Sequence, residues 1–474
     1  MQHNNKKIKY GFIWSAIDSF GVQITNLVIS LILANKLGPE AYGLIAMMAI
    51  FIAIAGVFVN SGFGSALIRK LDRTEKDLAT TFYFSLLVSL ACYGILFILS
   101  SHIAKFYSQP ELELLTKIIA LTLIINSLTV IPKTKLTIDL NFKKQALVNL
   151  TSTITGGGIG LIMAFKGYGV WSLVIQQITF SVVGAFLFSL VCPWRPKEPF
   201  SKKSFSELFG FGSKLLASGL LDAVYNNLYG LVIGKQFSAS QLGIYNQANV
   251  LSTVPATSIT NVIQKVTYPM LSQMQKDTDK LDVAYLNILK LVSMIVFPLL
   301  FGLCIVAEPF ISILLGKAWQ ESASLVSVLS IGMAVYPIHA VNLNMLQVKG
   351  RSDLFLKLEV IKKALVTIAL FITVPMGVME MCIGVVVTSY LSLVVNTYYT
   401  GKLSSISQVK QLKALAPIGI ITIISSLIGY YLGSGEEGDF LRLFSTLSSA
   451  FITYFSLMFV FQKKLLLTAK KLIF

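Results

Sequence analysis

The feature that most constrains this chain is its series of long apolar runs, each about the length of a membrane-spanning helix and separated by short polar stretches. A helix needs about 20 mainly apolar residues to cross the hydrocarbon of a bilayer. Only 13% of the 474 residues are charged, about half the share in ordinary soluble domains. The runs are continuous and do not alternate with a period of two, which argues against a β-barrel. We therefore predict an all-α, polytopic membrane protein.

The apolar runs predict about fourteen transmembrane helices. We place them near residues 12–35, 41–66, 78–101, 112–132, 146–165, 168–192, 207–234, 241–263, 283–307, 322–346, 355–375, 377–400, 412–432 and 440–461. The longest connections are then expected at 264–282 and 308–321, and neither can hold a catalytic domain.

The distribution of basic residues predicts the topology. With the N-terminus in the cytoplasm, most of the 39 Lys and Arg residues fall in segments assigned to the cytoplasm, as the positive-inside rule requires. The alternation persists to the end of the chain, so both termini are expected in the cytoplasm. The net charge of +17 is spread over these loops and forms no basic face with interleaved aromatic residues. We therefore exclude nucleic acid as a partner.

The sequence repeats at a constant offset of 200 residues. Residues 10–45 align with 210–245, which places Gly43 over Gly243. Each repeat contains six spans, and an even number preserves orientation, so the halves are parallel repeats. We predict an N-lobe over 1–200, a C-lobe over 201–405, and two additional helices with a cytoplasmic tail over 406–474. Two such lobes can rock about a central cleft, although a relic of gene duplication would leave the same pattern.

Ionisable residues inside membrane spans are costly and mark functional candidates. The informative ones are Asp18, Lys214, Asp222, Lys290 and His339. Lys214 either faces the cleft or pairs with a carboxylate or extends to the interface, and Lys290 is expected to extend to the interface. His339 follows Pro337 and either takes up a proton or packs between helices.

Two helical faces carry polar residues at related positions. On the seventh span, the face comprises Lys214, Ser218, Asp222, Tyr225, Asn226 and Tyr229. On the first span, the equivalent face comprises Trp14, Asp18, Val22, Thr25 and Asn26. These spacings of three, four and eight residues lie on one side of a helix. We interpret the two faces as candidates for lining one central cleft.

Other local signals concern helix geometry and chemistry. Pro255, Pro298 and Pro337 lie within spans and should kink them, and Gly156 and Gly160 form a small-xxx-small pattern typical of helix packing. The chain contains no GxGxxG after a strand, no P-loop and no HExxH. The four cysteines lie in apolar runs without CxxC spacing, which is typical of buried hydrophobic residues. We therefore predict neither an enzyme nor a metal or cofactor site.

Five stretches resemble a known family. "LGPEAYG" (37–43) and "SGFGSALIRK" (61–70) resemble the opening signature of bacterial polysaccharide flippases of the Wzx type. The second half matches at "LGIYNQANVL" (242–251), "TYPMLSQMQKD" (267–277) and "AEPFISILLGKAW" (307–319). Within the multidrug/oligosaccharidyl-lipid/polysaccharide (MOP) exporter superfamily, the chain is most similar to the lipopolysaccharide, colanic-acid and teichuronic-acid exporter branch.

The resemblance implies a V-shaped pair of six-helix lobes with alternating access. It implies a flippase of the bacterial cytoplasmic membrane that moves an undecaprenyl-diphosphate-linked oligosaccharide to the outer leaflet for surface polysaccharide (O-antigen, capsule, exopolysaccharide or teichuronic acid) biosynthesis, alongside other assembly proteins. A diphosphate-sugar headgroup cannot cross hydrocarbon unaided. Related flippases have cavities rich in arginine, whereas the intramembrane cations here are lysines, which lack the bidentate geometry of an arginine.

These considerations define candidate residues and rival functions. The candidates for the substrate-binding cleft are Lys214, Asp222, Tyr225, Asn226, Tyr229, Asn26 and Thr25. The candidates for coupling to a proton or sodium gradient are Asp18, Asp222 and His339. A cation-coupled multidrug antiporter of the same superfamily remains one alternative. A membrane oligosaccharide polymerase or glycosyltransferase is the other, although the large outer loop or soluble domain that it needs is missing.

Overall fold

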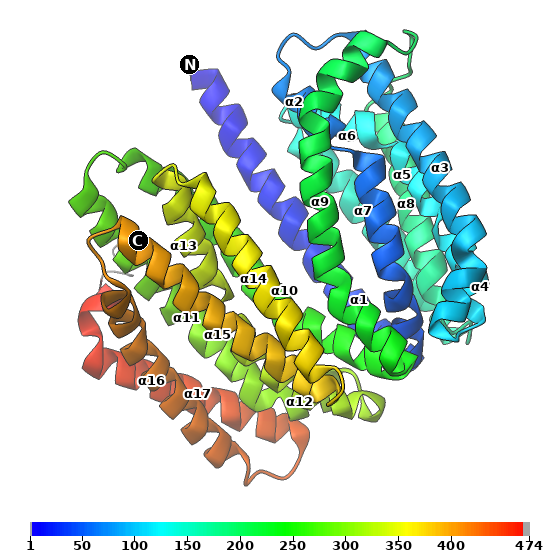
Figure 1. The fold of residues 1–474 in the computed structure, drawn as a ribbon. Helices are drawn as coiled ribbons and strands as arrows, with labels where there is room; N and C mark the ends of the chain where they lie inside the picture. The colour runs from blue at the N-terminus through cyan, green and yellow to red at the C-terminus, as the bar shows by residue number, and fades with distance from the viewer. Residues whose placement is uncertain (1, 468–474) are drawn as a thin grey trace. The chain divides into compact units, whose positions relative to one another are not determined.

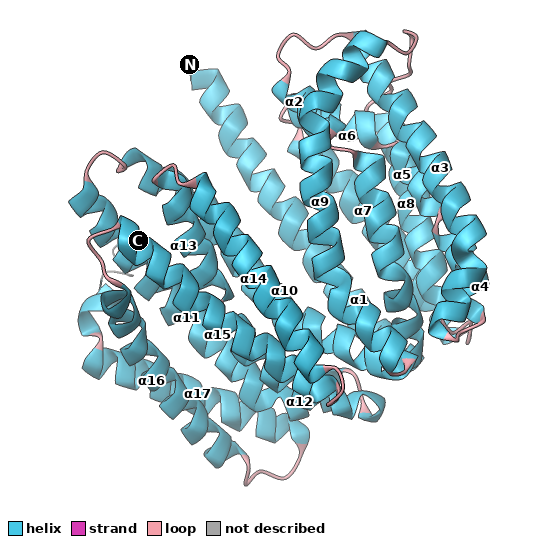
Figure 2. Ribbon diagram, in the orientation of Figure 1, coloured by secondary structure: helices cyan, strands magenta, loops and turns pink. Residues whose placement is uncertain are grey.

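The computed structural model describes residues 2–467, and the chain divides into two compact units, Met1–Gly243 (unit 1) and Ile244–Phe474 (unit 2). The described residues form helices joined by short connections, with no strand among them (Figures 1 and 2). The all-α fold is therefore confirmed. The predicted boundaries at 200 and 405 remain a prediction, and contacts place the helix at 202–236 in unit 1.

Unit 1 contains nine helices. They are α1 (Gln2–Asn60), α2 (Phe63–Arg69), α3 (Glu75–Tyr107), α4 (Glu111–Ile119), α5 (Leu121–Ser127), α6 (Val130–Ile138), α7 (Phe142–Phe165), α8 (Trp171–Val191) and α9 (Lys202–Gln236). The long α1 is two helices separated at Gly38, whose φ of 77° lies in the left-handed region. The break falls between the first two predicted spans, because glycine accepts this conformation and the following Pro39 lacks a backbone donor.

Unit 2 contains the remaining helices, with the first turn of α10 still in unit 1. They are α10 (Ala239–Gln273), α11 (Thr278–Leu314), the short 3₁₀ helix η1 (Lys317–Trp319), α12 (Gln320–Met333), α13 (Tyr336–Val348), α14 (Ser352–Thr373), α15 (Val378–Leu403), α16 (Gln408–Gly433) and α17 (Asp439–Phe461). The core of this unit surrounds α11, whose buried residues recur every three or four positions at Tyr285, Leu289, Val292 and Val296.

Each of the fourteen predicted spans overlaps one helix or up to three consecutive helices. Among the described residues, nine helical stretches are long and apolar enough to cross a membrane, or ten when the bent pair 111–127 and 130–138 is counted as one span. The chain is therefore a multi-pass membrane protein. The helices α9, α10 and α14 are not among these stretches, so the count of fourteen remains a prediction.

The repeat-related glycines form a reciprocal contact within unit 1. A Cβ at Gly43 would overlap with the carbonyl oxygen of Ala239, and a Cβ at Gly243 would overlap with that of Pro39. The two contacts exchange under the 200-residue offset, as expected for elements related by a local two-fold axis. This close approach supports the predicted alignment of Gly43 with Gly243 and explains why both positions are glycine.

Two expectations about connections and kinks have clear outcomes. The long connections expected at 264–282 and 308–321 are wrong, because α10 and α11 continue through most of these residues. Polar residues near the end of an apolar run do not prevent the helix from continuing. Pro337 lies in the first turn of α13, directly after the break from α12. Pro255 and Pro298 lie inside α10 and α11, respectively.

Candidate functional site

The candidates on the first half of α1 contact α7. The amide nitrogen of Asn149 donates to both carboxylate oxygens of Asp18, at 3.0 and 3.2 Å. One helical turn earlier, the ammonium of Lys143 lies 5.4 Å from the ring centroid of Trp14. Asp18 therefore has a polar partner on a neighbouring helix, which the sequence did not identify.

Asn26 lies two turns further along α1 and lines a small polar pocket. The pocket has a volume of about 160 Å³. Its lining residues are Asn26 from α1, Thr153 and Gly157 from α7, and Gln176, Gln177 and Phe180 from α8. Thr25, the other candidate on this helix, is partly buried and does not line the pocket.

The candidates on α9 differ in their exposure. Lys214, Asp222 and Asn226 are exposed, Tyr225 is partly buried, and Tyr229 is buried at 8% exposure. The helix packs on α1, α2 and α3. The face predicted on α9 is therefore open at its polar positions and packed at Tyr229. A single cleft lined jointly by these residues and by Asp18 remains a prediction.

His339 lies on α13 in unit 2, where it meets α15. Its Nδ1 is 3.1 Å from the amide nitrogen of Asn396, and its Nε2 is buried without a hydrogen-bond partner among the described residues. On the neighbouring α14, Lys362 forms an ion pair with Glu359. Both charged residues lie inside a predicted span but were not among the candidates. Asp18 was selected by the same signal, an ionisable residue within a span.

A second polar group in unit 2 is joined by hydrogen bonds, although Nδ2 of Asn342 is buried without a partner among the described residues. The hydroxyl of Tyr285 contacts the Asn342 side chain and lies 2.9 Å from Oε1 of Gln411. The amide nitrogen of Gln411 donates to the backbone carbonyls of Thr397 and Ile406, at 3.3 and 3.1 Å. These side chains are fully buried. The network therefore ties α16 to α11, α13 and α15.

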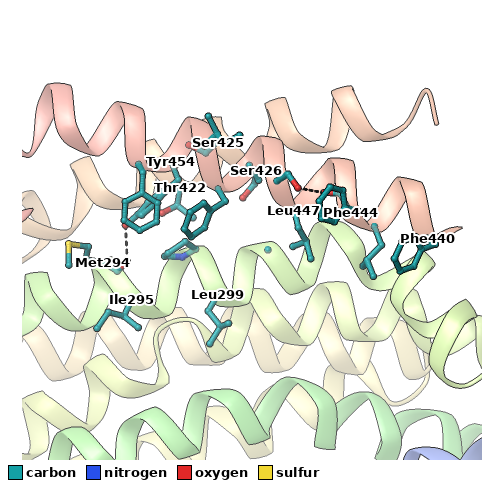
Figure 3. Close-up of a pocket in the computed structure, with 18 residues that line it drawn as sticks. Met294, Ile295, Leu299, Thr422, Ser425, Ser426, Phe440, Phe444, Leu447 and Tyr454 are labelled. Atoms are coloured by element: carbon teal, nitrogen blue, oxygen red, sulfur yellow. Dashed lines mark hydrogen bonds between the residues drawn. The ribbon is translucent and has the colours of Figure 1, made fainter.

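An apolar pocket lies on another side of α16, against α11 and α17 (Figure 3). Its volume is about 890 Å³, within the range of ligand-binding cavities. Phe440, Phe444 and Leu447 line it from α17, and Met294 and Leu299 line it from α11. The few polar groups include Tyr454, whose hydroxyl donates to the carbonyl oxygen of Met294 at 2.8 Å. The pocket is suited to an aliphatic chain.

An ion-pair cluster around Lys70 links three segments of unit 1. Lys70 lies 3.0 Å from Asp77 and 2.8 Å from Glu207, which joins the connection after α2 to α3 and α9. The hydrogen bond to Glu207 raises the pKa of Lys70 above its ordinary value. Asp77 also accepts from the backbone nitrogen of Thr74 in a capping box. Beside this cluster, Arg69 stacks over Phe211 at 4.6 Å.

The amino-acid sequence identifies the family of this chain. A family model described as "Polysaccharide biosynthesis protein" matches residues 32–324, which is more than half of the chain. The chain belongs to this polysaccharide biosynthesis protein family. The predicted resemblance is therefore confirmed at the family level. No described residues form a group of three or more His, Cys, Asp or Glu side chains that could hold a metal ion.

Two named bacterial proteins are similar to this chain over most of their length. The chain is 26% identical to the teichuronic acid biosynthesis protein TuaB of Bacillus subtilis (strain 168), covering 74% of this chain and 73% of that protein. It is also 26% identical to the lipopolysaccharide biosynthesis protein WzxC of Escherichia coli (strain K12), covering 82% and 78%.

Solved structures identify the fold. The lipid II flippase MurJ in an inward closed conformation superposes with a TM-score of 0.77 at 16% identity, covering 96% of this chain and 100% of that chain. A multidrug resistance MATE family transporter of the MOP superfamily gives 0.62 at 17% identity, covering 82% and 98%. At these identities, the likeness shows that the chain shares the fold of these two transporters.

Proposed function

We propose that this protein is a flippase that moves a polyprenyl-diphosphate-linked oligosaccharide from the cytoplasmic to the outer leaflet for surface polysaccharide biosynthesis. Membership of the polysaccharide biosynthesis protein family carries the proposal. The names of TuaB and WzxC refer to the biosynthesis of teichuronic acid and of lipopolysaccharide, and MurJ, which shares the fold, is a lipid II flippase. The protein acts in the bacterial cytoplasmic membrane, with both termini in the cytoplasm.

The chemical character of the two units supports an amphipathic substrate. A lipid-linked oligosaccharide combines a polar headgroup with an aliphatic tail, and the headgroup cannot enter hydrocarbon without compensating contacts. Unit 1 places Asp18, Asn26, Lys214 and Asp222 on helices of membrane length. Unit 2 contains the apolar pocket of α11, α16 and α17. The polar residues of unit 1 suit a polar headgroup, and the apolar pocket of unit 2 suits an aliphatic chain.

Transport of this kind requires no covalent step. The protein alternates between inward-open and outward-open states, and a proton or sodium gradient supplies the direction. Asp18, Asp222 and His339 are the candidate coupling residues. Lys214 attracts the diphosphate as a point charge, and other polysaccharide-assembly proteins deliver the substrate and take up the product.

Deleting the gene tests this function directly. The mutant should lose one surface polysaccharide, and its lipid-linked unit should accumulate on the cytoplasmic leaflet, where an impermeant lectin or oxidant cannot reach it in intact cells. Units that reach the outer leaflet without being polymerised would instead identify a polymerase. An intact polysaccharide together with increased sensitivity to cationic dyes would identify a multidrug antiporter.

A further inference from the structure

The polar pocket of unit 1 contains three side-chain amides with no protein partner. None of the side chains of Asn26, Gln176 and Gln177 hydrogen-bonds to another described residue. They lie within helices that are long and apolar enough to cross a membrane. Asn26 and Gln177 are exposed and Gln176 is partly buried, so their donors and acceptors are open to a ligand. Three of them around one pocket indicate that a polar ligand completes their hydrogen bonds.

The pocket exists because glycines let the three helices approach closely. A Cβ at Gly157 on α7 would overlap with Ile29 of α1, and one at Gly160 would lie 3.0 Å from Cβ of Gln176 on α8. A Cβ at Gly156 would lie 2.8 Å from the carbonyl oxygen of Gln176. The predicted packing role of Gly156 and Gly160 is therefore confirmed. The same contacts fix the backbone that carries Gln176.

The chemistry of the lining residues selects the class of ligand. Each amide offers two donors and an acceptor, which suits neighbouring hydroxyl groups that must both donate and accept. Phe180 adds an exposed aromatic surface against which an apolar ring face can pack. The pocket volume of about 160 Å³ is below that of sites for drug-sized molecules. No lining residue is charged, so the site does not suit a diphosphate.

We infer that this pocket binds one sugar ring of the transported headgroup and contributes to selecting the oligosaccharide. The inference rests on the proposed flippase function and specifies a recognition site within it. A metal cation fits less well, because hard cations prefer sites with carboxylate ligands. The nearest acidic residue on α1, Asp18, is eight residues from Asn26, about 12 Å along the helix, and is hydrogen-bonded to Asn149.

The test compares two lipids that differ only in their sugars. The full-length protein is reconstituted in lipid nanodiscs, and its affinity is measured for polyprenyl diphosphate with and without the oligosaccharide of the source strain. The wild type should bind the sugar-bearing lipid more tightly. The double variant Gln176→Leu/Gln177→Leu should lose about tenfold in affinity for that lipid, as expected for lost hydrogen bonds, and keep its affinity for the sugar-free lipid.

Two further variants separate recognition from folding. Thr155→Val is the matched control, because Thr155 lies on α7 outside the pocket and its hydroxyl bonds only to its own helix. It should bind both lipids like the wild type. Phe180→Leu keeps all three amides and removes only the aromatic ring. It should weaken binding of the sugar-bearing lipid several-fold, in the same direction as the double variant, without lowering the melting temperature.

Several outcomes would overturn the inference. They are equal wild-type affinity for the two lipids, equal losses for both lipids in the double variant, or a variant that changes only the dependence of flipping on an ion gradient. The last result would identify a cation site. Failure of the flippase function itself would be recognised separately, because the wild-type protein would then neither bind nor flip the sugar-bearing lipid and the gene deletion would leave the surface polysaccharide intact.

Discussion

The two units contain glutamines at membrane depth that have opposite surroundings. In unit 1, Gln176 and Gln177 line an open pocket and bond to no other described residue. In unit 2, Gln411 is fully buried and bonds to Tyr285 and to two backbone carbonyls. A buried glutamine whose hydrogen bonds are made specifies how helices pack, whereas amides without a protein partner remain open to a ligand. Gln411 therefore has a structural role, whereas the pocket of unit 1 is suited to binding a ligand.

Histidine 339 lies between these two extremes. One ring nitrogen contacts Asn396, and the other is buried without a partner among the described residues. The charged pair of Glu359 and Lys362 lies on the adjacent helix α14. Unit 2 therefore also contains a buried polar atom without a hydrogen-bond partner, Nε2 of His339. This free ring nitrogen is consistent with the coupling role proposed for His339.

The largest expected effect comes from replacing Gln411, the fully buried glutamine of unit 2. Gln411→Leu removes an acceptor from Tyr285 and a donor from the carbonyls of Thr397 and Ile406. We expect the free energy of unfolding to fall by about 3 kcal/mol, because several buried groups lose partners at once. Gln176→Leu should leave it unchanged or slightly raised. Chemical denaturation in lipid bicelles measures both, and equal losses would remove the distinction between the two units.

The sequence was sufficient for the all-α fold and the family. Long apolar runs located the helical segments, and the match of Gly43 with Gly243 anticipated two positions where only glycine fits. These features depend on local composition or on a constant offset, so a single chain reveals them. The extents of α10 and α11 were missed, because hydropathy reports the membrane-embedded part of a helix and not its end.

The site was less accessible to sequence analysis. Asp18 and Asn26 were selected as polar residues on one face, whereas their neighbours Asn149, Gln176 and Gln177 were not considered. Uncharged amides in an apolar run resemble ordinary hydrogen-bonding residues, and only the packing of α1, α7 and α8 shows which of them lack partners. The same limit hid the network of Tyr285 and Gln411, whose members come from distant segments.

An intermediate effect is expected from the exposed lysine of unit 1. Lys214→Ala should reduce flipping in proteoliposomes about tenfold, because a charge-assisted contact to the diphosphate is lost. Lys214→Arg should keep most of the activity, since the charge remains. The matched control is Lys290→Ala in unit 2, where the lysine is expected to extend to the interface and flipping should stay near the wild-type rate. Normal flipping by Lys214→Ala at normal abundance would remove Lys214 from the site.

The smallest effect concerns the ion pairs of Lys70 with Asp77 and Glu207. Asp77 is 1% exposed and keeps its capping bonds to Thr74 when Lys70 is replaced. Lys70→Met should therefore lower the free energy of unfolding by only about 1 kcal/mol at pH 7. The adjacent exposed Lys76→Met is the matched control and should be neutral.

The pH dependence of this cluster gives the sharper test. The pKa of Lys70 is raised in the folded protein, so the folded state holds the proton more tightly than the unfolded state. Its stabilisation is fully present below the ordinary lysine pKa of about 10.4 and is lost as the pH rises through the folded value. Thermal unfolding between pH 7 and 11 should therefore show a smaller alkaline decrease in Lys70→Met than in Lys76→Met. Identical pH profiles would show that the ion pairs of Lys70 with Asp77 and Glu207 do not stabilise the folded protein.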